Sequence, residues 1–188
     1  MRKRDWKELA NNMDRSPDIE FVQVKPGDWK KIQSIAYATW PKAFGEVLTK
    51  EQIDYMLKLI YNEDSLRNQM TVSGHLFILV YEGIEPVGFA SYEANYHSLP
   101  QLIVHKLYLL PQTQGKGIGT ILIRYLTDVA IKNNNNKLRL KVYYKNHRAI
   151  EFYRKNGFSD IGTETTSIGN DYNIIDNLMT KDIQGNMS

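Results

Sequence analysis

Three glycines stand between an apolar segment and an amphipathic segment in the stretch LPQTQGKGIGT, Leu110 to Thr120. Upstream, QLIVHKLYLLP is almost continuously apolar, which is typical of a buried strand that Pro111 ends. Downstream, apolar residues recur at three- and four-residue spacing and predict a helix from Gly117 to Lys132. A strand, a tight glycine loop and a helix start direct unpaired backbone N–H groups and the positive end of the helix dipole at one spot. The segment therefore predicts a phosphate-binding site.

Two common phosphate loops do not fit these letters. A P-loop requires a glycine five residues before the Gly-Lys pair, where Leu110 stands, and Thr120 occupies the last glycine position of G-x-G-x-x-G. The next apolar strand also runs into YKN rather than into the acidic residue that holds a ribose. ATP and dinucleotides are therefore disfavoured as ligands.

Composition narrows the classes of protein further. A chain of 188 residues with 42% hydrophobic residues is long enough for one core and too short for two ordinary domains. A net charge of +3 is too small to indicate a nucleic-acid partner, and no segment has the length of a membrane span or the apolar core of a secretory signal. With no cysteine, and with His75, His97 and His147 lacking metal-like spacing, we expect a cytoplasmic protein without a metal site.

The order of the remaining elements predicts an α+β fold with a strongly twisted mixed sheet. Residues 1–19 read as a polar arm or short helix, and residues 20–188 as a single domain. The expected elements are a strand at Phe21 to Val24, a helix capped by Asp28 and ended by Pro41, a helix from Lys50 capped by Thr49, a hairpin turning at Glu82 to Pro86, a strand over Lys137 to Tyr144, a short helix after Asn146 and a last hairpin around Gly169 to Tyr172.

Two motifs together identify a family. Gln114, Gly117 and Gly119 fit Q-x-x-G-x-G, and the segment NHRAIEFYRKNGF follows downstream. The pair resembles the GNAT acyltransferase superfamily from about Phe21 to the last strand, and the joint presence of both motifs at this spacing is highly specific. The resemblance implies a GNAT-like sheet of six or seven strands flanked by helices, with acetyl-CoA as co-substrate in transfer of an acetyl group to a primary amine.

The resemblance also implies where acetyl-CoA binds. Backbone N–H groups from Gly115 to Thr120 are expected on the pyrophosphate, the strand at Leu107 to Leu109 along the pantetheine arm, and Asn146 against that arm. Lys116, Lys145 and Arg148 are expected near the phosphates of CoA. The expected cofactor-binding residues are Leu107, Tyr108, Leu109, Gln114, Gly115, Lys116, Gly117, Ile118, Gly119, Thr120, Asn146 and Arg148. Without the resemblance, Asn146 reads as a helix cap.

Acyl transfer requires a deprotonated amine, a stabilised oxyanion and a proton for the departing thiolate. The resemblance places the oxyanion on an N–H near Leu109 and makes Tyr153 the acid, although by itself Tyr153 reads as a core residue. Many relatives carry a glutamate base on the central strand, but LIVHKLYLL contains no carboxylate. Glu93 and His105 are the remaining candidates for the base, either of them acting through a water, and His105 reads equally well as a core histidine.

The acceptor amine is expected near TWPKAFGE, where Trp40 and Phe44 follow a helix break. The segment around the first two helices and the ending IGNDYNIIDNLMTK most resemble bacterial spermidine and spermine acetyltransferases. Carboxylates that would replace the water around a polyamine are Glu46, Glu51, Asp54 and Glu93. Acetylation of a protein N-terminus or lysine, and a non-catalytic CoA-binding regulator, stay open as alternatives, as do a monomer and a homodimer.

Overall fold

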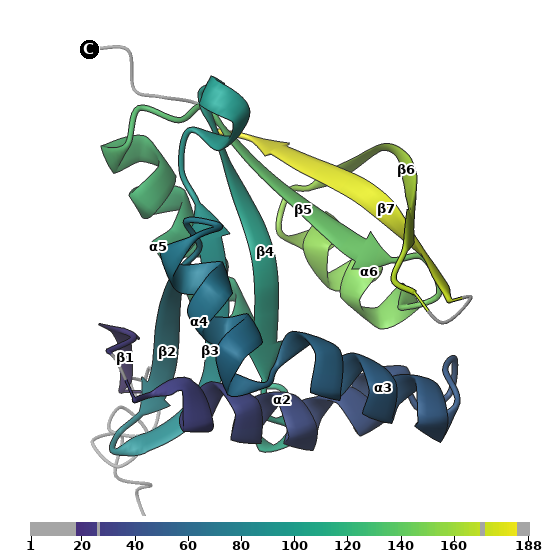
Figure 1. The fold of residues 1–188 in the computed structure, drawn as a ribbon. Coiled ribbons are helices and arrows are strands. Elements are labelled where there is room, and N and C mark those ends of the chain that lie inside the picture. Colours follow the sequence, from purple (N-terminus) through teal and green to yellow (C-terminus); the bar gives the residue numbers. More distant parts are fainter. Residues whose placement is uncertain (1–17, 26, 170–171, 184–188) are drawn as a thin grey trace, which may run out of the picture.

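The computed structural model describes residues 18–25, 27–169 and 172–183, so most of the arm predicted at 1–19 lies outside the described residues. One open sheet of seven strands runs in the order β1-β2-β3-β4-β5-β7-β6 (Figure 1). The strands are β1 (Ile19–Gln23), β2 (Leu76–Glu82), β3 (Glu85–Glu93), β4 (Gln101–Leu109), β5 (Lys137–Tyr143), β6 (Ser159–Ser167) and β7 (Asn173–Asp182). The β4–β5 pair is parallel and the other pairs are antiparallel, which confirms the mixed sheet.

Helices cover the two faces of the sheet. The helices are α2 (Trp29–Phe44), α3 (Lys50–Ile60), α4 (Glu63–Thr71), α5 (Ile118–Lys132) and α6 (His147–Lys155), with short 3₁₀ turns at Tyr96–Ser98 and Pro111–Thr113. Because side chains alternate along a strand, Ile78 packs with α5 and α6, while its neighbours Phe77 and Leu79 pack with α2, α3 and α4. Two hydrophobic clusters, one on each face, therefore hold the layers together.

The centre of the sheet opens between β4 and β5. These strands pair only over Gln101–Val104 and Lys137–Leu140, and beyond that point β5 continues in register with β7 alone. A β-bulge at His105 interrupts the pairing of β4 with β3, because Ser91 pairs with Lys106 and Tyr92 with Val104. The second half of β4 therefore borders an opening in the sheet (Figure 1).

The prediction that Pro41 ends its helix is wrong. Helix α2 continues through Pro41 to Phe44, so TWPKAFGE is mostly the last part of a helix and not a loop. A proline removes one backbone hydrogen bond, but Trp40 and Phe44 are buried on the same helix and their burial holds the last turn in place. Helix α4 is an element that the sequence patterns missed.

The two predicted helix caps behave differently. Thr49 accepts a hydrogen bond from the N–H of Gln52, whose side chain accepts one from the N–H of Thr49, so the predicted cap of α3 is confirmed. Asp28 stands at the N-cap position of α2, but its carboxylate accepts from the N–H of Lys25 and from the Lys31 ammonium instead of from the first turn of the helix. Burial of the apolar face therefore outweighs the cap at the start of α2.

Candidate functional site

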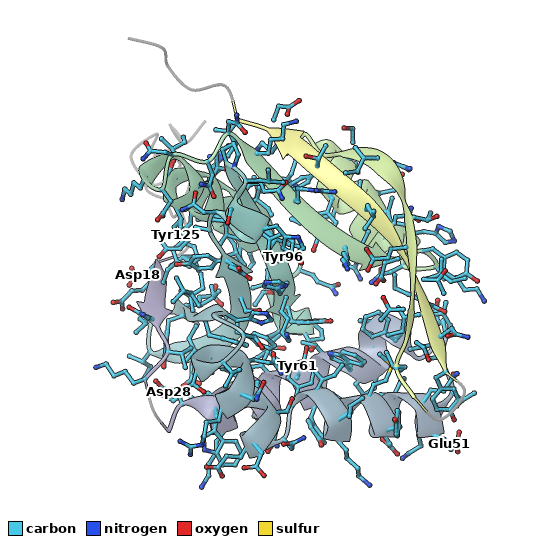
Figure 2. All side chains as sticks on the ribbon, turned by 45° about the horizontal axis from the view of Figure 1, so that its top comes forward. Asp18, Asp28, Glu51, Tyr61, Tyr96 and Tyr125 are labelled. Carbon is cyan, nitrogen blue, oxygen red and sulfur yellow. The ribbon has the colours of Figure 1, made fainter. Side chains whose placement is uncertain are left out.

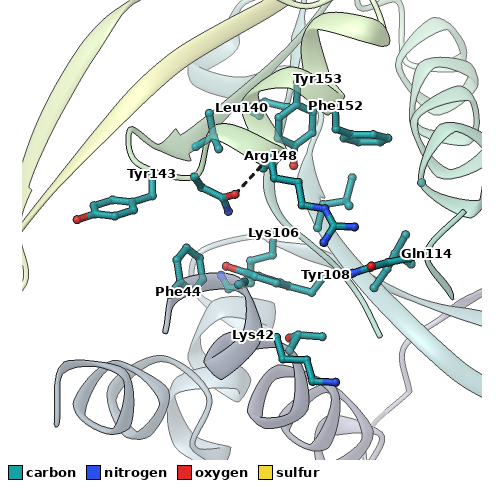
Figure 3. Close-up of a pocket in the computed structure, with 18 of the residues that line it drawn as sticks. Lys42, Phe44, Lys106, Tyr108, Gln114, Leu140, Tyr143, Arg148, Phe152 and Tyr153 are labelled. Atoms are coloured by element: carbon teal, nitrogen blue, oxygen red, sulfur yellow. Dashed lines mark hydrogen bonds between the residues drawn. The ribbon is translucent and has the colours of Figure 1, made fainter. Parts of the chain in front are cut away.

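A cavity of about 1130 Å³ lies where β4 and β5 separate. Its walls come from the end of α2, the second halves of β4 and β5, the glycine loop, the first turn of α5, and α6 (Figure 3). The predicted residues that line it are Phe44, Glu46, His105, Leu107, Tyr108, Leu109, Gln114, Gly115, Gly117, Ile118, Gly119, Thr120, Lys145, Asn146, Arg148 and Tyr153. The fold thus brings together segments that lie far apart in the chain.

The glycine loop presents free backbone N–H groups to this cavity. Gly115 and Gly117 have φ values of 80° and 75°, a backbone conformation that favours glycine. Among the hydrogen bonds of the described residues, none uses the N–H of Gly115, Gly117, Ile118 or Gly119 as donor. Four unpaired donors at the start of α5 are therefore available to an anion.

Two N–H groups of the predicted cradle are already engaged. The N–H of Lys116 donates to the Thr113 carbonyl at 3.3 Å, and that of Thr120 donates to the Gly117 carbonyl at 3.0 Å. The cradle is therefore narrower than the full run from Gly115 to Thr120.

Gly119 is also required for packing between two helices. A Cβ atom at this position would lie 2.9 Å from Cζ of the Phe152 ring, a separation that real Cβ atoms essentially never show. Phe152 belongs to α6, so Gly119 permits close contact between the starts of α5 and α6. The sequence motif indicated the glycine, but the contact with Phe152 emerges only from the fold.

Lys116 points away from the cavity. Its ammonium lies 2.7 Å from the carboxylate of Glu82 at the end of β2, and it is not among the residues that line the cavity. The expectation that Lys116 neighbours the phosphates of CoA is therefore not supported by its position. Arg148 and Lys145 do line the cavity, as do Lys42 and His147, which sequence reasoning missed.

Helix α6 positions Tyr153. Asn146 accepts a hydrogen bond from the N–H of Ala149 at 3.1 Å, so it is the N-cap of α6 as well as a cavity residue. Tyr153 is 8% exposed and packs edge-on against Phe152 and Phe158. Burial, with a smaller contribution from Tyr108, raises the pKa of the Tyr153 phenol well above its usual value. Its hydroxyl therefore stays protonated at neutral pH.

The two candidate bases lie together. Nε2 of His105 is 3.4 Å from a carboxylate oxygen of Glu93, and only His105 lines the cavity. Burial, together with the neighbouring His75, Lys106 and Lys141, lowers the pKa of His105 to about 3. His105 is therefore uncharged at neutral pH, with Glu93 behind it.

His75, which the sequence patterns did not single out, stacks on His105. The ring centres are 3.8 Å apart and the planes differ by 12°. Burial lowers the pKa of His75 to about 4, so this ring is also uncharged at neutral pH. The ligand atoms of His75, Glu93 and His105 lie within 4.8 Å of one another. Because an imidazole binds a metal in its ring plane, two nearly parallel rings direct their lone pairs side by side rather than at one point.

A smaller cavity of about 260 Å³ adjoins the first on the side of α2 and α3. Trp40 and Phe44, both predicted, line it together with the aromatic residues Tyr61, Tyr108, Tyr143 and Tyr172. Asp176 of β7 is the one carboxylate among the described residues that line it, and burial raises the pKa of this carboxyl above its usual value. His105, Lys106 and Tyr108 line both cavities, so the two spaces meet at β4.

The four predicted acidic residues are dispersed. Glu46 lines the larger cavity. Glu51 lies near the outer end of α3 (Figure 2), Asp54 pairs with Lys50, and neither lines either cavity. Glu93 reaches the site only through His105. Asp176 was missed because an acid in a strand far along the chain carries no local signal. Lys106 was missed as well, although a lysine within the apolar run LIVHKLYLL is a visible signal.

No helix among the described residues has the length and apolar character needed to cross a membrane. The family model "Acetyltransferase (GNAT) family" matches residues 29–158. A streptothricin acetyltransferase from Streptomyces lavendulae is 32% identical over 162 residues, which cover 78% of this chain and 84% of that protein. A spermidine N(1)-acetyltransferase from Thermoplasma acidophilum is 24% identical over 144 residues, covering 74% of this chain and 88% of that protein.

The fold also has solved counterparts. The crystal structure of PaiA N-acetyltransferase from Thermoplasma acidophilum, in complex with coenzyme A, matches with a TM-score of 0.73 and 23% identity, covering 88% of this chain and 99% of that one. A GCN5-related N-acetyltransferase from Rhodopseudomonas palustris matches with a TM-score of 0.73 and 24% identity, covering 89% and 96%. The family match spans both motifs and most of the cavity, and the chain therefore belongs to the GNAT family as an acetyl-CoA-dependent N-acyltransferase.

Proposed function

We propose that this enzyme acetylates the primary amine of a small molecule, with polyamines as the first substrates to test. The observation that carries the proposal is the junction of the two cavities at His105, Lys106 and Tyr108. A thioester held along β4 in the larger cavity would meet an amine held in the smaller one. The match to a protein named as a spermidine acetyltransferase supports the choice of polyamines.

The proposed cofactor half works through backbone groups. The free N–H groups at Gly115, Gly117, Ile118 and Gly119 bind the pyrophosphate, and the pantetheine arm lies along Leu107 to Leu109. An N–H near Leu109 stabilises the oxyanion that develops on the thioester carbonyl. Binding and polarisation of the thioester are thus assigned mostly to the main chain.

Tyr153 is proposed to stabilise the departing thiolate. A phenol has a pKa of about 10 and a thiol one of about 8.5, so complete proton transfer from tyrosine to thiolate is uphill. Burial raises the pKa of Tyr153 further. We therefore assign to its hydroxyl a hydrogen bond that strengthens as charge develops on sulfur, with solvent restoring any proton that Tyr153 gives up.

His105 and Glu93 are proposed to remove the proton from the amine. His105 faces the cavity, and Glu93 lies 3.4 Å behind it, so a proton passes from the amine through His105, or through a water held by it, towards Glu93. An imidazole with a pKa of about 3 holds a proton only briefly, and the adjacent carboxylate supplies the opposite charge during that time.

In the acceptor half, aromatic rings and one acid would recognise the ammonium group. Trp40 and Phe44 lie 4.8 Å apart by ring centres, and Trp40 and Tyr108 lie 6.0 Å apart. Such rings attract organic cations, and Asp176 supplies a negative charge across the cavity.

The test is an acetylation panel that measures release of free CoA. The panel contains spermidine, spermine, putrescine, cadaverine and lysine-bearing peptides, each compared with protein and acetyl-CoA alone. Turnover of polyamines above peptides supports the proposal. Turnover of peptides alone would assign the enzyme to protein acetylation. Binding of acetyl-CoA without turnover of any amine would favour a non-catalytic CoA-binding regulator.

A further inference from the structure

One lysine lies inside the site instead of at its rim. Lys106 follows the bulge at His105 and lines both cavities (Figure 3). It is half-buried, and its Nζ lies 5.7 Å from the centre of the Phe77 ring, on the face of the sheet that α2 covers. Lys106 therefore borders the junction where a thioester and an acceptor amine would meet, while its amine lies over Phe77, which lines neither cavity.

Lys106 differs from the other lysines that line the larger cavity in its burial, because Lys42, Lys141 and Lys145 are exposed whereas Lys106 is half-buried. Lys141 pairs with Glu164, and Lys116 pairs with Glu82. Among the ion pairs of the described residues, none includes Lys106. Burial lowers the pKa of Lys106 to about 8, so a large fraction of this side chain is an uncharged amine near that pH. An uncharged lysine amine is a nucleophile.

The thioester would lie in the same cavity that the Lys106 side chain lines. Leu109, at the end of β4, is three residues further along the strand, which is about 10 Å at 3.3 Å per residue. The expected path of the pantetheine arm along Leu107 to Leu109 ends, on the side away from the glycine loop, next to Lys106. The four-carbon stem of a lysine is flexible enough to turn its amine along that path.

We propose that Lys106 is itself an acetyl acceptor, modified from bound acetyl-CoA when no amine fills the smaller cavity. The lone pair of Nζ forms a bond to the thioester carbon, and the carbon–sulfur bond breaks with its electrons going to sulfur. The proton lost from nitrogen ends on the thiolate, so the products are Nε-acetyl-lysine and free CoA. This inference rests on the use of acetyl-CoA and not on the identity of the small amine.

Such a modification would limit the activity of the enzyme. Acetylation removes the charge of Lys106 and adds an acetyl group at the entrance to a cavity of only about 260 Å³. We expect preincubation with acetyl-CoA to slow later turnover of a free amine, and the presence of that amine during preincubation to protect the enzyme.

The experiment incubates the whole protein with acetyl-CoA and no amine, and maps acetyl groups on every lysine by peptide mass spectrometry. At pH 8, a group with a pKa of about 8 is about half uncharged, whereas an ordinary lysine with a pKa of about 10.4 is uncharged in less than about 1% of molecules. We therefore expect Lys106 to be acetylated faster than the exposed Lys58 by up to about a hundredfold. The rate at Lys106 should level off above pH 8, while rates at ordinary lysines continue to rise.

Two variants and one condition serve as controls. Lys106→Arg should abolish the modification at this position and the slowing that follows preincubation. Lys141→Arg changes a cavity lysine that is already ion-paired, and Lys106 should still be acetylated in it. Unfolding in urea should remove the preference for Lys106, because the preference depends on the folded cavity.

The result that overturns the inference is a folded protein that acetylates free amines while Lys106 stays unmodified, or is modified no faster than Lys58. That result leaves the proposed function intact. Acetylation of Lys106 without turnover of any free amine would have the opposite meaning, since it would support self-acetylation and contradict the proposed function.

Discussion

The larger cavity offers mainly backbone groups to a ligand, whereas the smaller cavity offers mainly side chains. The larger one presents main-chain N–H groups at Gly115, Gly117, Ile118 and Gly119, fixed by a loop and a helix start. The smaller one is walled by side chains from helices and strands that are remote in sequence, such as Trp40 and Asp176. A backbone site suits a co-substrate that never changes, whereas a side-chain site can vary from one relative to the next without disturbing the fold.

The largest expected effect tests the proposed side-chain chemistry of the larger cavity. Tyr153→Phe removes one hydroxyl and leaves the ring packing against Phe152 and Phe158. We expect kcat to fall on the order of 10²-fold with little change in the KM for acetyl-CoA, because the hydroxyl acts mainly in the transition state. Steady-state kinetics across neutral pH checks this. A kcat within about threefold of the parent would make Tyr153 a packing residue.

A second prediction tests whether Gly119 is needed for CoA binding, for packing against Phe152, or for both. Gly119→Ala places a Cβ 2.9 Å from the Phe152 ring, and we expect a loss of about 1–3 kcal/mol of unfolding free energy. Phe152→Leu in the same chain makes room and should recover part of that loss. Thermal or denaturant unfolding measures the stability of each variant, and calorimetry measures CoA binding. Stability that recovers while CoA affinity does not would show that the pyrophosphate needs this glycine as well.

Asp176→Asn tests whether the two cavities bind different substrates. The change keeps the shape of a side chain that lines only the smaller cavity and removes its charge. We expect the KM for a diamine or polyamine to rise about tenfold, the equivalent of about 1.4 kcal/mol, because a hydrogen bond to a charged group is lost. The KM for acetyl-CoA should not change. An equal rise in both values would contradict the division between the cavities.

The stacked histidines should make stability sensitive to acid. Their folded pKa values, about 4 for His75 and about 3 for His105, lie below the 6.5 of a free histidine, so the unfolded chain binds more protons between these values. Stability is therefore complete above about pH 6.5 and falls as the pH decreases, by up to about 1.4 kcal/mol per unit for each histidine. Denaturant unfolding at two pH values measures the slope. His75→Phe should flatten it, whereas His97→Gln, at an exposed position, should not.

The smallest effect concerns the rim of the cofactor site. Lys116 is paired with Glu82 and faces away from the cavity, so Lys116→Ala should change the KM for acetyl-CoA by less than about threefold. Arg148→Ala, at a position that lines the cavity, is the matched comparison and should raise this KM more. A larger effect at Lys116 than at Arg148 would reverse our placement of these two cations.

The features that could be predicted from the sequence are those set by neighbouring residues, and the features that could not are those set by long-range packing. The loop from Gln114 to Gly119 and helix α5 follow from neighbouring residues, so spacing and glycine positions were sufficient. The contact between Gly119 and Phe152, and the stack of His75 on His105, depend on long-range packing that no local pattern encodes. The continuation of α2 through Pro41 is a case in which tertiary burial outweighs local preference.

The separation of β4 from β5 gives this sheet an additional edge in its interior. Sheet edges ordinarily attract strand-like partners, and a chain with an exposed edge must prevent unwanted pairing. Here that edge faces a cavity of about 1130 Å³ in which an extended, amide-containing arm can take the position of a neighbouring strand. A guest in that position would complete the sheet as well as bring the reactive group. Stability then rises with its concentration, by about 2.7 kcal/mol at one hundred times Kd, so the supply of acetyl-CoA in the cell would help to set how much of this protein stays folded.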